Sequence, residues 1–215
     1  MANTNITKLT VVRHGETLWN QQLKIQGHLN SNLSELGIRQ AQAIANALVG
    51  NQFDALYASD LGRAVQTAEI IAQRLNLKVV TDVRLRERCY GIVQGLTHDE
   101  FQQELPEQYA LYLSGNTEFI IPGGENARQF FDRVLSCAHE IAERHSRQHV
   151  AIVTHGGVLD TFIRKTFDLP LGASRRYSLF NSSINSFTVS DSKWKLESWG
   201  NILHLRSVGI TEQQL

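Results

Sequence analysis

The stretch ITKLTVVRHG (residues 6–15) is a run rich in β-branched residues that ends on an arginine, a histidine and a glycine. A similar pattern returns later in the chain as HVAIVTHGG (149–157). Runs of this composition are typical of buried strands. One strand that turns polar at its end can simply be meeting water. Two strands that both end on His-Gly favour a site at one edge of a sheet.

Segments with strand character alternate with segments of helical periodicity along the chain. This order indicates an α/β fold with a mostly parallel central sheet. No linker-like stretch divides the chain, so we expect a single domain over residues 1–215. Besides the two runs above, strands are expected at 53–59, 78–82, 183–190 and 193–200, the last two as a hairpin. Helices are expected at 35–48 after an N-cap at Ser34, and at 60–75, 97–114, 125–145 and 158–167.

The composition describes a soluble globular protein, with 42% hydrophobic and 20% charged residues. Lys plus Arg and Asp plus Glu both number 21, so no overall basic field exists to hold nucleic acid or an anionic membrane. No apolar run approaches the ~20 residues of a membrane span, and the N-terminus lacks the pattern of a signal peptide. Cys89 and Cys137 fit neither a zinc motif nor a disulfide framework. We therefore expect a cytoplasmic protein.

Polar groups from four segments can meet beyond the strand ends. Arg13 and His14 follow the first strand, Arg63 lies in the first turn of an expected helix, Glu87 follows another strand, and His155 ends the repeat of the opening pattern. The arginine fork suits phosphate oxygens, and a helix N-terminus beside Arg63 adds backbone donors. The sequence therefore predicts a compact cationic pocket for a phosphoryl group.

Several common phosphate and acyl chemistries are excluded by missing motifs. The chain has no GxxxxGK[ST], GxGxxG or GxSxG, and no CxxxxxR follows either cysteine. A histidine can itself be the nucleophile, which favours His14 beside Arg13. Glu87 can protonate the leaving oxygen and then activate water. A metal held by His14 and His155 is disfavoured because Arg13 and Arg63 would repel a divalent cation, so we expect neither metal nor other cofactor.

Four motifs occur in a fixed order: RHGET (13–17), SDLGRAVQTAE (59–69), LRERCYGIVQG (85–95) and THGG (154–157). Together they resemble the histidine phosphatase, or phosphoglycerate mutase-like, superfamily over nearly the whole chain. The resemblance implies a three-layer α/β/α sandwich with a metal-independent site that works through a phosphohistidine.

The resemblance also implies roles for individual residues. His14 would be the nucleophile and Glu87 the proton donor, with Arg13, Arg63 and His155 on the phosphoryl oxygens. The residues that it places around the substrate are Asn20, Gln26, Gly27, Tyr90 and Gly156.

A lid-like insertion at about 96–122 bears on the choice between phosphatase and mutase. Mutases of this superfamily carry a pair of lid arginines, whereas this segment has no Lys or Arg and five carboxylates. His98 stands where those mutases have a lysine. An acidic lid would repel a bisphosphorylated glycerate, which favours hydrolysis of a small phosphomonoester with limited extra negative charge. The carboxylates can equally be a solvated face. A cofactor-dependent phosphoglycerate mutase is the alternative, and a non-catalytic phosphate-binding regulatory domain is a third.

Some residues are expected at the surface. His28 and His98 are interpreted as exposed histidines, with contact to the substrate as the alternative. Arg175 and Arg176 are interpreted as surface arginines that could also reach a second anionic group of the substrate. An exposed strand edge would allow a homodimer. The expected partner is otherwise a small phosphomonoester, with neither nucleic acid nor membrane.

Overall fold

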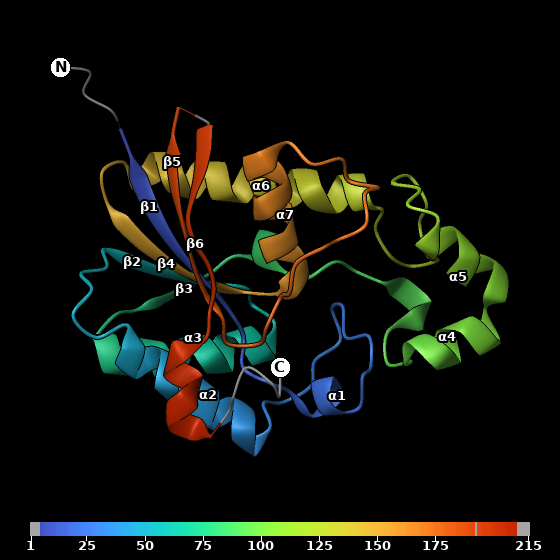
Figure 1. Cartoon of the computed structure of the whole chain (residues 1–215), viewed down its shortest axis with the longest axis horizontal. Helices are drawn as coiled ribbons and strands as arrows, with labels where there is room; N and C mark the ends of the chain where they lie inside the picture. Colours follow the sequence, from blue (N-terminus) through green and yellow to red (C-terminus); the bar gives the residue numbers. More distant parts are fainter. Residues whose placement is uncertain (1–4, 192, 210–215) are drawn as a thin grey trace.

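The computed structural model describes residues 5–191 and 193–209. These residues form a six-stranded sheet in the order β3-β2-β4-β1-β5-β6 (Figure 1). The first four strands of that order are parallel, and β5 and β6 add an antiparallel hairpin. The mostly parallel sheet and its late hairpin are thus confirmed. The strands are β1 (Thr7–Arg13), β2 (Ala55–Ala58), β3 (Val79–Thr81), β4 (His149–Thr154), β5 (Ile184–Ser190) and β6 (Lys193–Asn201).

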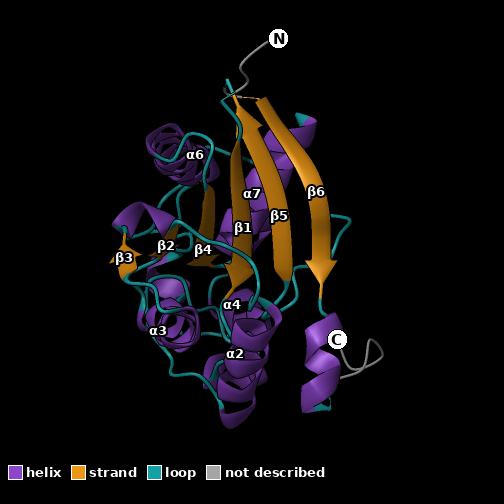
Figure 2. Ribbon diagram, turned by 90° about the vertical axis from the view of Figure 1, so that its left-hand side faces the viewer, coloured by secondary structure: helices purple, strands orange, loops and turns teal. Residues whose placement is uncertain are grey.

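Helices cover both faces of the sheet. Figure 2 shows α2 and α3 on one side and α6 and α7 on the other, which confirms the three-layer arrangement. The α-helices are α1 (Leu18–Gln21), α2 (Glu35–Ala47), α3 (Gly62–Leu75), α4 (His98–Glu104), α5 (Pro106–Leu113), α6 (Ala127–Arg144) and α7 (Gly156–Phe167). Short 3-10 helices are η1 (Val83–Leu85), η2 (Gly91–Val93) and η3 (Leu203–Val208).

The central strands are apolar throughout because both of their faces are buried. Leu9, Val11 and Ile152 point into the core beneath α6 and α7. Val12 and Val153 point the other way, into the core beneath α2 and α3. Side chains alternate between the two faces of each strand, so each central strand contributes residues to two separate cores. The same alternation determines the direction of the polar side chains at the strand ends.

The register of β1 and β4 brings the two His-Gly segments together. Arg13 lies opposite Thr154, and the backbone N–H of His14 donates to the Thr154 carbonyl over 2.9 Å. His155 follows as the N-cap residue of α7, with extended backbone. The helix begins at Gly156, two residues earlier than expected, so its N-terminus opens directly at the strand ends.

The segment 96–122 forms two short helices around a small core of its own. Thr97 caps α4 in a capping box with Glu100, and Pro106 begins α5. Their apolar faces enclose Phe101 and Ile121 away from the two sheet cores, and Figure 1 shows both helices set apart from the sheet. The helical character expected over 97–114 is confirmed, but the stretch is divided into two helices, because Pro106 cannot continue the first one.

The expected domain, 1–215 with a lid-like insertion, stays a prediction, and it includes residues 1–4, 192 and 210–215 outside the described ones. Cys89 and Cys137 are both free thiols. Across 5–191 and 193–209, the helices are all too short or too polar to span a bilayer.

Candidate active site

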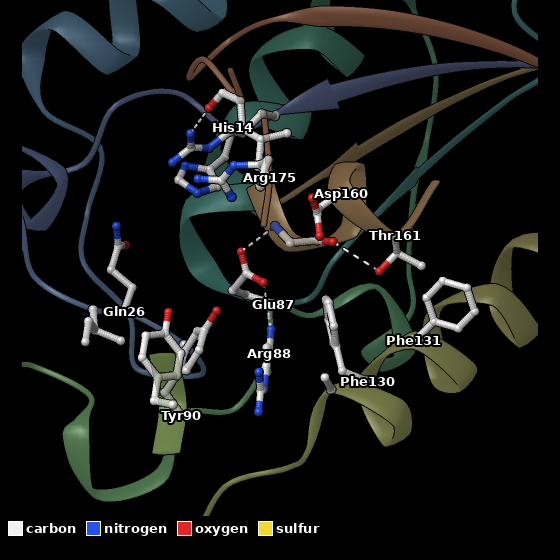
Figure 3. A pocket seen from close by; sticks show the side chains of 18 of the residues that line it. His14, Gln26, Glu87, Arg88, Tyr90, Phe130, Phe131, Asp160, Thr161 and Arg175 are labelled. Atoms are coloured by element: carbon white, nitrogen blue, oxygen red, sulfur yellow. Dashed lines mark hydrogen bonds between the residues drawn. The ribbon is translucent and has the colours of Figure 1, made fainter. Parts of the chain in front are cut away.

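A cavity of about 460 Å³ lies where β1 and β4 end (Figure 3). Of the ten residues predicted for the site, nine line this cavity, and they come from the end of β1 and from the loops and helices that follow β1, β2, β3 and β4. The tenth, His155, is fully buried behind the wall. Its ring meets the ring of His14 edge-on, with centroids 5.2 Å apart. The nine lining residues are Arg13, His14, Asn20, Gln26, Gly27, Arg63, Glu87, Tyr90 and Gly156.

Hydrogen bonds fix which nitrogen of His14 can react. Its Nδ1 lies 2.7 Å from the Gly15 carbonyl, which can only accept, so Nδ1 carries the proton. The lone pair is then on Nε2, which accepts from Arg63 Nε over 3.3 Å. Only 3% of His14 is exposed. The imidazole therefore presents a basic nitrogen beside a guanidinium.

The surroundings keep His14 neutral. Burial lowers its pKa well below the usual value, and the charges of Arg63 and Arg13 lower it further. The two arginines are themselves buried, which lowers the pKa of each to about 10 and leaves both charged at neutral pH. A neutral imidazole is the form that can attack phosphorus.

Arg63 is held rigidly by the loop that follows α1. It is 1% exposed, and its terminal nitrogens donate to the carbonyls of Gly27 (2.8 Å) and Leu29 (2.9 Å). The Asn30 side chain accepts from the Arg63 backbone N–H over 3.0 Å. Gly27 takes a positive φ of 52° here, a conformation that glycine adopts at little cost. The loop thus aims Nε of Arg63 at His14.

His155 has one partnered and one unpartnered nitrogen. Its Nε2 lies 2.8 Å from Ser59 Oγ, which also accepts from the Leu61 backbone N–H over 3.3 Å. The Ser59 hydroxyl proton is therefore available to Nε2, and in that arrangement Nδ1 is an N–H donor. Ser59 follows β2 and was not singled out from the sequence.

Among the described residues, three buried side-chain atoms have no hydrogen-bond partner: Arg13 Nε, His155 Nδ1 and Gln26 Oε1. All three belong to residues predicted for this site. Buried polar atoms are nearly always paired, since leaving one unpaired costs roughly 1–3 kcal/mol. Two of the three are potential donors beside His14, which is the arrangement that an anion would satisfy.

Glu87 faces His14 from the loop after η1. Its Oε1 accepts from the Arg88 backbone N–H (2.8 Å), and its Oε2 accepts from the Gly157 N–H in the first turn of α7 (2.9 Å; Figure 3). Two backbone donors from different elements therefore fix the carboxyl group. The side chain is partly exposed at the cavity, where it can exchange protons with a leaving group and with water.

An ion pair that the sequence did not reveal holds the segment carrying Glu87. Arg133 of α6 bonds Glu125 over 2.5 Å and donates to the carbonyls of Arg84 (2.7 Å) and Arg86 (3.2 Å). His28 Nε2 lies 2.8 Å from the Glu87 carbonyl. His28 is half-buried, so its interpretation as an exposed surface histidine is wrong, because this bond draws it inward.

Asn20 and Tyr90 flank the cavity. The Asn20 Oδ1 accepts from Thr17 N and Oγ1 and from Asn181 Nδ2, at 3.0 to 3.3 Å, so its amide nitrogen is turned from these partners. Tyr90 packs edge-on against Tyr112 of α5, with centroids 6.3 Å apart. His98 is exposed as expected, yet it also lines the cavity.

The acidic residues of 96–122 do not face the cavity. All five carboxylates are exposed, and none of them lines the wall. Of the two interpretations left open by the sequence, their exposure supports the solvated face, because short amphipathic helices turn their charged faces to solvent. The five residues are Asp99, Glu100, Glu104, Glu107 and Glu118.

Comparisons with known proteins identify the family. A model of the histidine phosphatase superfamily (branch 1) matches residues 9–202. The chain belongs to this superfamily. Within it, the chain is 39% identical to a metal-independent phosphoserine phosphatase of Arabidopsis thaliana over 214 residues, which cover 98% of this chain and 88% of that protein.

Two further proteins, one curated sequence and one solved structure, are similar to this chain. A phosphoglycerate mutase-like protein 4 of Arabidopsis thaliana is 38% identical over 215 residues, covering 98% of this chain and 92% of the relative. The structure of a phosphoserine phosphatase variant from Entamoeba histolytica with phosphoserine aligns with a TM-score of 0.83 at 28% identity, over 93% of this chain and 99% of that one. The resemblance, the fold and the class of phosphoric monoester hydrolase are thereby confirmed.

Proposed function

We propose that this histidine phosphatase hydrolyses a small phosphomonoester through a phosphohistidine on His14. The observation that carries the proposal is the pairing of a neutral His14, whose Nε2 lone pair is free of a proton, with unpartnered donors on Arg13 and His155. These donors, together with Arg63, can hold the phosphoryl oxygens around the attacking nitrogen.

In the first step Nε2 of His14 attacks phosphorus, and the bond from phosphorus to the ester oxygen breaks. Glu87 gives its proton to that oxygen, and the alcohol leaves. In the second step the Glu87 carboxylate takes a proton from water as the water oxygen attacks phosphorus. The P–N bond breaks, inorganic phosphate leaves, and Glu87 is protonated again. Arg13, Arg63 and His155 offset the charge that develops on the phosphoryl oxygens in both steps.

The remaining site roles belong to the same proposal. Asn20, Gln26, Gly27, Tyr90 and Gly156 would surround the phosphoryl group and its leaving group. A phosphorylated amino acid is a reasonable first substrate, because a relative is named for phosphoserine. A cytoplasmic location and a homodimer stay predictions.

The test is phosphate release from p-nitrophenyl phosphate in excess EDTA, with the wild type beside His14→Ala. We expect chelator-resistant turnover that the variant loses by at least about a thousandfold, as expected when the nucleophile of a covalent mechanism is removed. Turnover that EDTA abolishes, or that His14→Ala retains, would contradict the proposal. A mutase would transfer the phosphoryl group between substrate and bisphosphoglycerate without net phosphate release.

A further inference from the structure

We propose that Arg175 and Arg88 form a second anion site at the exposed side of the cavity, and that it binds a carboxylate of the substrate. The inference rests on the proposed function, since it concerns the group attached to the leaving oxygen. The segment 96–122 has no Lys or Arg, and the positive charge comes instead from the loops that carry Arg88 and Arg175.

The first observation is the balance of charge around the cavity. Besides Arg13 and Arg63 at the phosphoryl position, and Arg164, which pairs with Asp160, the wall carries Lys24, Arg88 and Arg175. None of these three makes an ion pair among residues 5–191 and 193–209. A phosphomonoester dianion would match the two inner arginines, so the three remaining cations call for further negative charge.

The carboxylates of the wall do not supply it. Glu87 is the proposed proton donor. Asp160 is already neutralised, because its Oδ2 accepts from Arg164 Nε and its Oδ1 from the Tyr177 hydroxyl, both over 2.7 Å. The carboxylates that line the cavity therefore do not neutralise the positive charge of Lys24, Arg88 and Arg175.

Arg88 is positioned next to Glu87, the proposed proton donor. It follows Glu87 directly, and its backbone N–H bonds the Glu87 carboxyl group. Its Nε donates to the Glu125 carbonyl over 3.1 Å, and its guanidinium lies 5.5 Å from the centre of the Tyr90 ring. The two terminal nitrogens have no partner among the described residues. The leaving group of the substrate, attached to the oxygen that Glu87 protonates, would therefore lie beside the Arg88 guanidinium group.

Arg175 approaches the same cavity from the loop after α7. Its side chain makes no hydrogen bond or ion pair within the described chain, although it lines the wall (Figure 3). Burial is the largest cause that lowers the pKa of Arg13, Glu87 raises it, and the charge of Arg175 lowers it further. Such an effect of Arg175 on Arg13 is expected when the two guanidinium groups face the same cavity. Arg176, the next residue, is equally exposed but does not line it.

A carboxylate is the group that this site suits. It is planar and accepts two parallel N–H bonds from one guanidinium. The substrate class is therefore a short phosphomonoester with a carboxylate a few bonds from the ester oxygen. The expectation of a substrate with limited extra negative charge rested on the carboxylates of the segment 96–122, which face solvent. The residues that face the substrate are the cations of the cavity wall, and they favour an additional negative charge.

Binding to an inactive protein tests the site without requiring turnover. In the His14→Ala background, O-phosphoserine and phosphoethanolamine would be titrated by calorimetry, since they differ only in the carboxylate. We expect Arg175→Gln to weaken O-phosphoserine binding about 10- to 100-fold, the range for a hydrogen bond to a charged group, and to affect phosphoethanolamine far less. The matched control Arg176→Gln should leave both affinities within about twofold, as expected for a surface change.

Equal losses for the two ligands, or an equal effect of Arg176→Gln, would overturn the anion site. A wild type that binds O-phosphoserine through Arg175 but releases no phosphate from it or from p-nitrophenyl phosphate would instead contradict the proposed function while leaving the anion site supported. A parallel comparison of kcat/KM for the two esters should show the Arg175→Gln defect mainly on O-phosphoserine.

Discussion

His14 and His155 directly follow two neighbouring parallel strands, and their rings meet edge-on with centroids 5.2 Å apart. Both are buried beside Arg13 and Arg63, and burial is the largest cause that lowers the pKa of each. Two uncharged imidazoles thus stand next to two guanidinium groups. This arrangement suits a site in which one ring attacks phosphorus while the other donates to its oxygen.

Stability should fall as the pH decreases through about 6.5, the ordinary histidine pKa in an unfolded chain. In the folded state the pKa of His14 and of His155 lies well below that value. The unfolded state therefore binds more protons in this range, and each histidine removes up to about 1.4 kcal/mol of unfolding free energy per pH unit.

Urea unfolding at pH 7.5 and 5.5 measures this loss, with His14→Gln/His155→Gln as the comparison. The variant should lose clearly less stability over the interval than the wild type. Other histidines with lowered pKa, such as His28 and His149, contribute to both proteins alike. An identical loss in the variant would show that the two site histidines are not held neutral.

Replacing the proposed proton donor should make the rate depend on the leaving group. Glu87→Gln keeps an acceptor for the Gly157 N–H but cannot give a proton to the ester oxygen. We expect kcat on alkyl phosphates to fall by about 10²–10⁴, the usual contribution of a positioned acid or base. Phosphorylation of His14 by p-nitrophenyl phosphate should suffer less, because nitrophenolate leaves without protonation.

Steady-state rates on a series of esters with graded leaving-group pKa provide the measurement. The slope against leaving-group pKa should steepen in Glu87→Gln relative to the wild type. Parallel slopes in the two proteins would mean that another group protonates the leaving oxygen.

Removing Arg133 should loosen the segment that carries Glu87. Arg133→Met leaves Glu125 without its ion pair and frees the carbonyls of Arg84 and Arg86. Because the pair is partly exposed, we expect a loss of about 1–3 kcal/mol in unfolding free energy. We also expect a kcat defect without a matching change in KM.

Arg128→Met is the control for that variant, since Arg128 is an exposed residue of the same helix. Its unfolding free energy should stay within about 0.5 kcal/mol of the wild type. If both variants lose the same stability, or if Arg133→Met keeps full kcat, the ion pair does not position the Glu87 segment.

The sequence predicted the parallel sheet and the gathering of Arg13, His14, Arg63 and Glu87, because strand periodicity places residues at a sheet edge. What it missed depends on contacts between distant loops. Ser59 stands in the motif SDLGRAVQTAE, but the motif does not show that its hydroxyl bonds His155, a contact between segments that follow different strands.

Orientation was the harder problem at the entrance of the cavity. The charge of 96–122 could be counted, but not which way its short helices would turn. Arg175 and Arg176 are adjacent and chemically identical, and only the path of the loop after α7 distinguishes the one that lines the cavity. The same limit explains His28, whose inward turn follows from the position of the Glu87 carbonyl.

The most direct measurement is to trap the intermediate. The wild type and His14→Ala would be mixed with excess p-nitrophenyl phosphate, quenched in alkali, where phosphohistidine survives, and digested for mass spectrometry. We expect one added phosphoryl group on the peptide carrying His14 in the wild type and none in the variant. Turnover with no phosphorylated His14, or a phosphoryl group on another residue, would contradict the proposed mechanism.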